Sequence, residues 1–240
     1  MSTTDFDPTQ LEAAQLRLTA SLREAALDEE LRQPSRLPEW SRAHVLVHIS
    51  RNAEGLQNLL LAARTGAALR MYSSPTTRAA DIAANVNRPP EVIVADVVES
   101  SFRFLVEARD LPLEAWSNMV AFNSGAPNPP SIPALRVAEL RLEEVEVHHV
   151  DLDIGYEFSD TPSDVADLLI RNFAGRRAVQ GVAVNIELDE DALAISRGPR
   201  GAPTIHGKRA DVLGWLAGRT VHNLSADTKD GTPPVLPPLA

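Results

Sequence analysis

Two pairs of side chains with helical spacing could bind a divalent metal. In the segment 143–151, Glu144 and His148 are four residues apart, so on a helix they share one face. His44 and His48 have the same spacing earlier in the chain. A glutamate and a histidine from one helix, completed by a histidine from another, would give two imidazoles and one carboxylate with a coordination position left open. This ligand set is typical of catalytic rather than structural zinc, although it also suits nickel, cobalt or iron(II).

Each of these residues also has an ordinary structural explanation. A Glu four residues before a His is common by chance on an acidic helix face that is exposed to water. A single histidine among apolar residues, such as His48 beside Val47, could be a hydrogen-bonded core residue. The residue types alone leave open whether His44 or His48 is the third ligand. His149 lies about 100° away from His148 on an ideal helix, so we expect it to pack or to support the site rather than to bind the same ion.

Two polar residues follow the histidines at short spacing. Asn52 comes one helical turn after His48, and we expect it to bind the substrate. Asp151 comes three residues after His148 and could orient that imidazole, which is the usual role of a carboxylate behind a metal-binding histidine. Asp151 could equally cap the end of the helix.

Composition narrows the functions that such a site could serve. The chain has no cysteine, which excludes disulfides, thiolate metal ligands and a cysteine nucleophile, so any thiol chemistry needs an external thiol. The 23 basic and 33 acidic residues give a net charge of −10, which argues against binding to nucleic acid or to an anionic membrane. No apolar run approaches the roughly 20 residues of a membrane span, and residues 1–8 are polar and acidic rather than a signal peptide. We therefore expect a cytoplasmic protein whose partners are small molecules.

The candidate ligands lie in a part of the chain whose pattern predicts helices. Asp7 and Ser41 are good N-caps, Gly66 is a good helix stop, and a Pro-Pro pair opens a further helix. Apolar spacing and turn residues predict long helices over about 8–25, 41–66, 90–111 and 133–149, a short helix within 72–87 and a loop over 123–133. Four long helices joined by medium loops predict a four-helix bundle, a fold that builds metal sites from facing helices.

The pattern changes after Gly155. The expected elements there are a helix over 164–179, a half-buried strand over 182–188, a hairpin partner around Leu193 and Ile195, and a short helix over 209–218. We therefore predict a mainly α fold class with a small α+β part. The expected domains are a four-helix bundle over residues 1–155 and a small C-terminal α/β domain over residues 156–240.

Three segments carry a resemblance to a known family. They are residues 44–56, which read HVLVHISRNAEGL, residues 141–152, which read RLEEVEVHHVDL, and residues 214–219, which read GWLAGR. These segments look like those of mycothiol-dependent maleylpyruvate isomerases. The resemblance covers almost the whole chain, including Trp40 and a Leu-Pro-Pro near the end, and the segment 141–152 is the most specific. Each segment alone also occurs in a wider group of DinB-like metal-binding bundles.

The resemblance implies a DinB-like metal-binding bundle followed by a sterol-carrier-like domain, with zinc held by His48, Glu144 and His148. It also implies catalytic roles for Arg219 and for Arg78. Without the resemblance, a favourable contact with a helix dipole would explain Arg219. The implied activity is the zinc- and mycothiol-dependent cis–trans isomerisation of 3-maleylpyruvate to 3-fumarylpyruvate in gentisate degradation. The implied route is thiolate addition, bond rotation and elimination.

Two other kinds of function use the same ligands. A mycothiol S-transferase would attack another electrophile and leave the thiol attached to the product. A non-catalytic metal-binding module, such as a sensor or a carrier, would need no open coordination position, so an intact three-ligand site argues for an enzyme. We expect a monomer that takes a small-molecule substrate and a low-molecular-weight thiol.

Overall fold

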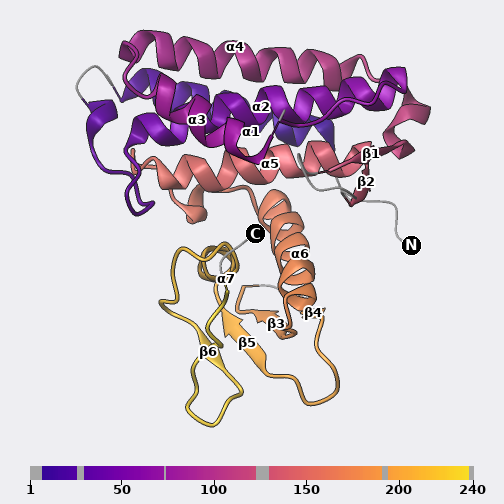
Figure 1. Ribbon diagram of the computed structural model, residues 1–240. Coiled ribbons are helices and arrows are strands. Elements are labelled where there is room, and N and C mark those ends of the chain that lie inside the picture. The colour runs from indigo at the N-terminus through magenta and orange to yellow at the C-terminus, as the bar shows by residue number, and fades with distance from the viewer. Residues whose placement is uncertain (1–6, 26–29, 73, 123–129, 191–193, 238–240) are drawn as a thin grey trace. The chain divides into compact units, whose positions relative to one another are not determined.

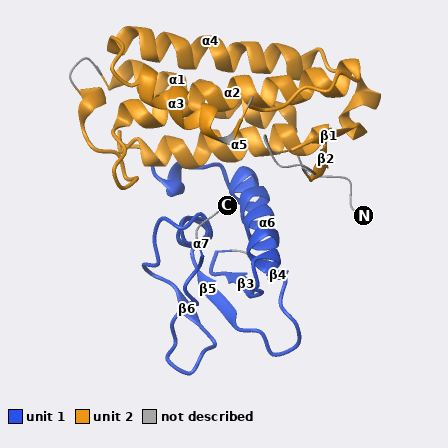
Figure 2. Cartoon of the chain, viewed as in Figure 1, with its two compact units in different colours: residues 1–5, 157–240 blue, residues 6–156 orange. Residues whose placement is uncertain are grey.

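Figure 1 shows the computed structural model of the protein, which describes residues 7–25, 30–72, 74–122, 130–190 and 194–237. The chain divides into two compact units, one spanning Phe6–Tyr156 and the other Glu157–Ala240 (Figure 2). Within the described ranges, no helix is both long enough and apolar enough to cross a lipid bilayer.

Four long helices form the bundle of the first unit. They are α1 (Pro8–Glu24), α2 (Arg42–Thr65), α4 (Pro90–Arg109) and α5 (Ala134–Asp151). Helix α2 packs against α4 and α5, and α1 packs against the same two helices from the other side of the bundle. The shorter α3 (Pro75–Asn85) packs on α2, and the 3-10 helices η1 (Glu30–Arg32) and η2 (Leu113–Ser117) lie in the connections. The predicted four-helix bundle is confirmed.

The ends of α1 and α2 follow the signals in the sequence. The Asp7 side chain accepts a hydrogen bond from the backbone of Thr9, and Gln10 completes the capping box. Ser41 caps α2, and its backbone N–H is bound in return by the His44 side chain. At the other end of α2, Gly66 takes a left-handed φ of 73°, which glycine adopts at little cost.

The loop predicted over 123–133 is partly a strand. Strand β1 (Met119–Ala121) pairs antiparallel with β2 (Ser131–Pro133), and residues 123–129 between them lie outside the described part of the chain. Strand β2 was not predicted because its segment is rich in proline. An edge strand tolerates a proline, because the N–H groups on its open edge make no hydrogen bonds to another strand. The pairing leads directly into α5, since the Ala134 N–H donates to the Asn118 carbonyl at 2.9 Å.

The second unit combines two helices with a small mixed sheet. Its elements are η3 (Phe158–Asp160), α6 (Ser163–Val179), β3 (Asn185–Leu188), β4 (Ala194–Ser196), β5 (Thr204–Gly207), α7 (Arg209–Leu216) and β6 (Ser225–Ala226). The strand order is β4-β3-β5-β6, with β3 and β5 parallel and the other pairs antiparallel. Helix α6 packs against α7. A mainly helical chain with a small sheet-containing C-terminal part is therefore confirmed.

The strands of this unit differ in detail from the prediction. The strand expected from Val182 begins at Asn185, because the Val182 N–H donates to the Arg177 carbonyl and closes the end of α6. Ile195 lies in β4 as expected, whereas Leu193 falls outside the described residues. Strands β5 and β6 were not predicted, because the buried positions of β5 are Ile205 and a glycine, and β6 has only two residues, so neither shows an alternation of large apolar and polar side chains.

Candidate metal centre

Helices α2 and α5 lie side by side and bring three candidate ligands together (Figure 1). The Nε2 atom of His48 lies 2.8 Å from Oε2 of Glu144 and 3.0 Å from Nε2 of His148. The Nε2 atom of His148 lies 3.2 Å from the same Glu144 oxygen. Glu144 and His148 share one face of α5, as their spacing predicts, and His48 faces them from α2.

The structure places His48, rather than His44, in this cluster. The Nδ1 atom of His44 accepts from the Ser41 N–H at 3.2 Å and contacts the Ser41 hydroxyl at 2.7 Å. The His44 ring also stacks on Trp40, with 6.1 Å between ring centroids. His44 therefore takes part in the N-terminal cap of α2, one turn before the cluster.

The positions of the three donor atoms fit a metal ion. Tetrahedral zinc with bonds of about 2.0–2.1 Å places its ligand atoms about 3.3 Å from one another. The three separations in the cluster, 2.8, 3.0 and 3.2 Å, come close to this value. The side chain of His48 is 3% exposed and that of Glu144 is 31% exposed, so the cluster is accessible from the Glu144 side.

The positions of the protons on the two imidazoles also favour a bound cation. Arg78 donates to Nδ1 of His48 at 2.9 Å, so a neutral His48 carries its proton on Nε2. If His148 is charged, its Nε2–H faces the Nε2–H of His48. If His148 is neutral with its proton on Nδ1, its Nε2 lone pair faces the Glu144 carboxylate. A metal bound by all three lone pairs removes both conflicts, provided that Arg78 moves away from Nδ1 of His48.

The electrostatic environment shifts the pKa values of His48 and His148 in opposite directions. Burial lowers the pKa of His48 to about 4, and the neighbouring His148 adds to this effect. Burial also disfavours charge on His148, but Asp151 and Glu144 outweigh it and raise the pKa of that imidazole. Burial alone would raise the pKa of Glu144, whereas the hydrogen bonds of His148 and His48 bring it well below its usual value. Glu144 is therefore an ionised carboxylate at neutral pH, as a metal ligand must be.

Asp151 supports the cluster from behind. It is the last residue of α5 and is fully buried, and its Oδ2 lies 2.8 Å from Nδ1 of His148. A carboxylate in this position accepts the Nδ1 proton and directs the Nε2 lone pair of His148 toward a metal. Of the two roles that the sequence left open for Asp151, this contact corresponds to the orientation of the histidine.

Asp151→Asn is expected to weaken zinc binding by roughly 10-fold or more, because an amide is a poorer acceptor for the Nδ1 proton of His148. Competition with a chromophoric chelator measures the affinity. The matched control is Asp153→Asn, which changes an exposed carboxylate that pairs with Arg36. The backbone of Asp153 has a positive φ, which asparagine also tolerates. Equal zinc affinities for the two variants would show that Asp151 does not support the metal.

Asn52 lies in the bundle core. It is 2% exposed, and its Oδ1 accepts a hydrogen bond from Nη1 of Arg141 at 2.9 Å. This contact gives Asn52 a structural role. Substrate binding by Asn52 stays a prediction.

Arg141 joins all four helices of the bundle from inside the core. From α5 it donates to the Ile49 carbonyl and to Asn52 on α2, to the Ser101 hydroxyl on α4 at 3.0 Å, and to Gln15 on α1 at 3.4 Å. These acceptors are all neutral. Burial lowers the pKa of Arg141 to about 10, so the guanidinium stays charged at neutral pH. The sequence pattern gave no sign of this role.

Arg219 belongs to the second unit, where it follows α7. Its Nη1 donates to the Ala217 carbonyl at 2.9 Å. A contact of this kind at the end of a helix is what the residue pattern explains without any reference to a family. An anion-binding role for Arg219 stays a prediction.

Two aromatic residues near the cluster carried no signal in their spacing. The Trp40 ring stands edge-on to His48, with 5.7 Å between the centroids. Tyr72, at the start of the ambiguous segment 72–87, places its hydroxyl in a buried position near the cluster. Trp40 precedes the start of α2, so its four-residue spacing to His44 did not place it beside the ligands, and Tyr72 belongs to a separate segment. Only the packing of the chain shows that both rings lie near the cluster.

His149 packs on a different face of α5 from His148, as predicted. It is 1% exposed and stacks on Tyr156, with ring centroids 3.8 Å apart and an angle of 1° between the rings. Burial lowers the pKa of His149 to about 3. The Tyr156 hydroxyl donates to Glu146 at 2.7 Å, and Glu146 also pairs with Arg17 of α1 at 2.5 Å.

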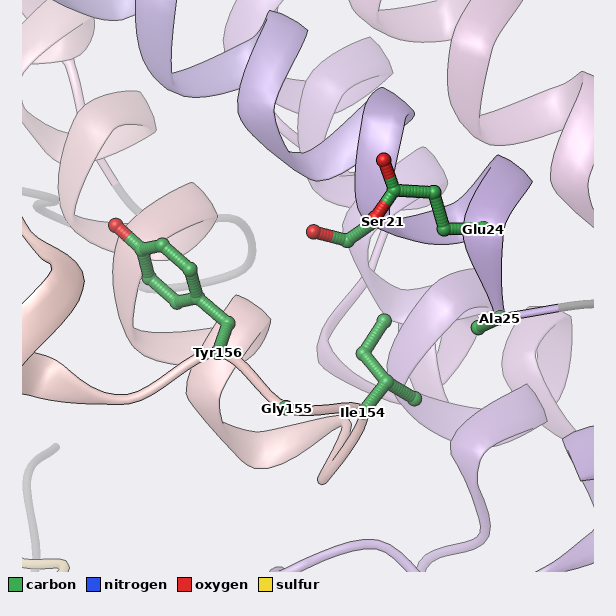
Figure 3. Close-up of a pocket in the computed structure, with 6 residues that line it drawn as sticks. All are labelled: Ser21, Glu24, Ala25, Ile154, Gly155 and Tyr156. Carbon is green, nitrogen blue, oxygen red and sulfur yellow. The ribbon is translucent and has the colours of Figure 1, made fainter.

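A hollow of about 270 Å³ opens beside Tyr156 (Figure 3). Its lining comes from the end of α1 and from the segment after α5, and consists of Ser21, Glu24, Ala25, Ile154, Gly155 and Tyr156. None of these six residues is a candidate metal ligand. The hollow is therefore separate from the cluster of His48, Glu144 and His148.

The comparisons with known proteins agree with this geometry. The family model described as the mycothiol maleylpyruvate isomerase N-terminal domain matches residues 11–153, a span that contains all three candidate ligands. None of the curated proteins matches the chain significantly.

Two crystal structures are similar to the chain along its whole length. The structure of the mycothiol-dependent maleylpyruvate isomerase shares 26% identity, with a TM-score of 0.84 over 99% of this chain and 100% of that chain. A histidine-to-alanine mutant of a mycothiol-dependent maleylpyruvate isomerase shares 25% identity, with the same TM-score and the same coverage. Because the family model covers more than half of the sequence, the chain belongs to the mycothiol maleylpyruvate isomerase N-terminal domain family.

Proposed function

We propose that the protein isomerises 3-maleylpyruvate to 3-fumarylpyruvate with zinc as its metal and mycothiol as its thiol. The observation that carries this proposal is the convergence of His48, Glu144 and His148 in a chain that belongs to this family. The similarity to a mycothiol-dependent maleylpyruvate isomerase over the whole chain supports it further. The absence of cysteine agrees with a thiol that comes from outside the protein.

The three ligands would hold zinc through two imidazole nitrogens and one carboxylate oxygen. When bound, zinc lowers the pKa of a coordinated thiol, so that the sulfur is a thiolate at neutral pH. Asp151 keeps the Nε2 lone pair of His148 directed at the ion. The exposed side of Glu144 leaves an approach for the thiol and the substrate.

The reaction requires rotation about a carbon–carbon double bond. The thiolate sulfur adds to one carbon of that bond, and the electron pair moves through the conjugated system onto the carbonyl oxygen as an enolate. The former double bond is now single and rotates. The enolate electrons then reform the double bond in the trans geometry and expel the thiolate, so thiol and protons are unchanged overall.

The arginines would bind the negative charges of the substrate. Arg78 lies against His48, and its guanidinium becomes available to an anion once His48 coordinates a metal and no longer accepts from it. Arg219 would contribute a second guanidinium. Arg219→Ala tests that role, with the exposed Arg197→Ala as its control. If Arg219→Ala keeps the kcat/KM of the control, the contact with Ala217 is sufficient to explain the residue.

The activity is expected to require both zinc and an added thiol. Dialysed, zinc-loaded enzyme should convert maleylpyruvate to fumarylpyruvate with mycothiol and lose nearly all of this rate without it, because the chain has no thiol of its own. Chromatography of the two isomers measures the conversion. An undiminished rate without thiol would refute addition and elimination by a thiolate. A stable thiol adduct in place of the trans isomer would instead identify an S-transferase.

A further inference from the structure

The Tyr72 hydroxyl is buried, and its proton has no acceptor among the residues that the structure describes, because the neighbouring Arg78 can only donate. A buried donor without a partner is destabilising, and phenols in protein interiors usually find an acceptor. Phenylalanine would fill the same space without that cost. The hydroxyl therefore needs an explanation other than packing.

A glycine on α2 brings Tyr72 to the helix face that carries His48. His48, Asn52 and Gly55 follow one another at helical spacing on that face. A Cβ atom at Gly55 would lie 2.7 Å from Cγ of Met71, 3.0 Å from the Met71 carbonyl oxygen and 3.3 Å from Cε1 of Tyr72. The segment of Met71 and Tyr72 can thus approach α2 only because residue 55 has no side chain.

The charges around Tyr72 are those of the candidate metal centre. Burial raises the pKa of Tyr72 to about 12, and Glu144 reinforces this effect. Arg78 opposes it through its charge and through a hydrogen bond to the phenol oxygen, and Arg141 opposes it through its charge. The phenol is therefore protonated at neutral pH and can only donate to an anion. Arg78 lies close enough to act on the phenol electrostatically, and it also reaches His48, so both donors face the same site.

We propose that Tyr72 is a further catalytic residue, whose hydroxyl donates a hydrogen bond to the carbonyl oxygen of the substrate as that oxygen becomes an enolate. This inference rests on the proposed function. The addition of thiolate creates negative charge on that oxygen, and a neutral donor beside the Arg78 guanidinium stabilises it where it forms. Tyr72 keeps its proton throughout, so no bond of the tyrosine forms or breaks.

Tyr72→Phe is expected to lower kcat by roughly 10²-fold with a smaller change in KM, because the lost hydrogen bond forms mainly with the developing charge. Zinc content should equal that of the wild type. The melting temperature should be unchanged or higher, since the variant removes a buried hydroxyl whose proton has no acceptor among the described residues.

The other tyrosine of the chain provides a matched control. Tyr156→Phe removes a hydroxyl that donates to Glu146 at 2.7 Å. It should lower the melting temperature and leave kcat near the wild-type value. The two variants thus make the same chemical change with opposite expected effects on stability and on catalysis.

Binding of maleate to the zinc-loaded protein, measured by calorimetry, separates this inference from the proposed function. Tyr72→Phe should weaken maleate binding at least about 5-fold, while Tyr156→Phe should not. If the wild type fails to isomerise maleylpyruvate but Tyr72→Phe still loses maleate affinity, the proposed function fails and Tyr72 remains an anion donor.

Three results would overturn the role of Tyr72. The first is wild-type kcat and wild-type maleate affinity in Tyr72→Phe. The second is a wild-type protein that neither turns over maleylpyruvate nor binds maleate. The third is a melting temperature in Tyr72→Phe that falls as far as in Tyr156→Phe, which would mean that the hydroxyl is a bonded part of the core.

Discussion

His148→Ala is expected to lower the affinity for zinc by more than about 100-fold and to remove the proposed isomerase activity. Mutation of a residue that only supports a ligand lowers metal affinity by about 10- to 100-fold, so loss of the ligand itself should lower the affinity further. His148 supplies one of three donor atoms that lie within 2.8 to 3.2 Å of each other. Elemental analysis after gel filtration, together with chelator competition, measures the loss. His48→Ala should behave in the same way.

The neighbouring histidine is the control for this result. His149→Ala removes an imidazole that stacks on Tyr156 on another face of α5. It should cost stability through the lost packing, yet the purified protein should keep its full zinc content. Full zinc content in His148→Ala would show that the ligands have been assigned wrongly.

Arg141→Ala is expected to lower the free energy of unfolding by about 3–5 kcal/mol. The truncation leaves a cavity in the core and removes the donors from acceptors on three other helices. For a chain of this length such a loss lowers the melting temperature by roughly 10 °C. Urea denaturation and thermal scans followed by circular dichroism measure both quantities.

Two variants show whether the hydrogen bonds or the filled volume matter at this position. Arg141→Met keeps most of the volume and removes the buried charge, so it should lose less stability than Arg141→Ala. Arg103→Ala breaks ion pairs with Glu54 and Glu99 that are largely exposed, and it should change the unfolding free energy by less than about 1 kcal/mol. An Arg141→Ala protein as stable as Arg103→Ala would mean that the core does not depend on this network.

Local spacing accounts for the parts of the site that the sequence could predict. Glu144 and His148 belong to one helix, so their shared face follows from the geometry of α5 alone. The choice between His44 and His48 depends on which turn of α2 faces α5, and spacing within one helix does not contain that information. In the structure, His44 contacts Ser41 at the start of α2, which leaves His48 as the ligand. The sequence did not suggest this contact, because the usual capping-box partner of a serine is a glutamate or a glutamine.

The unpredicted features all depend on contacts between distant segments. In the sequence, Arg141 is an ordinary charged residue of a helix. It is buried in the structure because three other helices pack around it. Tyr72 comes near His48 because Gly55 leaves room for it on α2. The helices and their caps were predictable because their signals lie within a few residues, whereas β5 has one large buried apolar residue and β6 has two residues in all.

The distance along the chain between the candidate ligands determines when the protein could bind a metal during synthesis. His48 and Glu144 are separated by 96 positions, and α5 is the last helix of the bundle to leave the ribosome. A nascent chain that ends before Glu144 offers a single imidazole from this site and lacks the helix that packs against both α1 and α2. A metal ion that needs all three ligands therefore could not nucleate the folding of the first three bundle helices in such a nascent chain. The energy of metal binding would become available only after α5 has been synthesised.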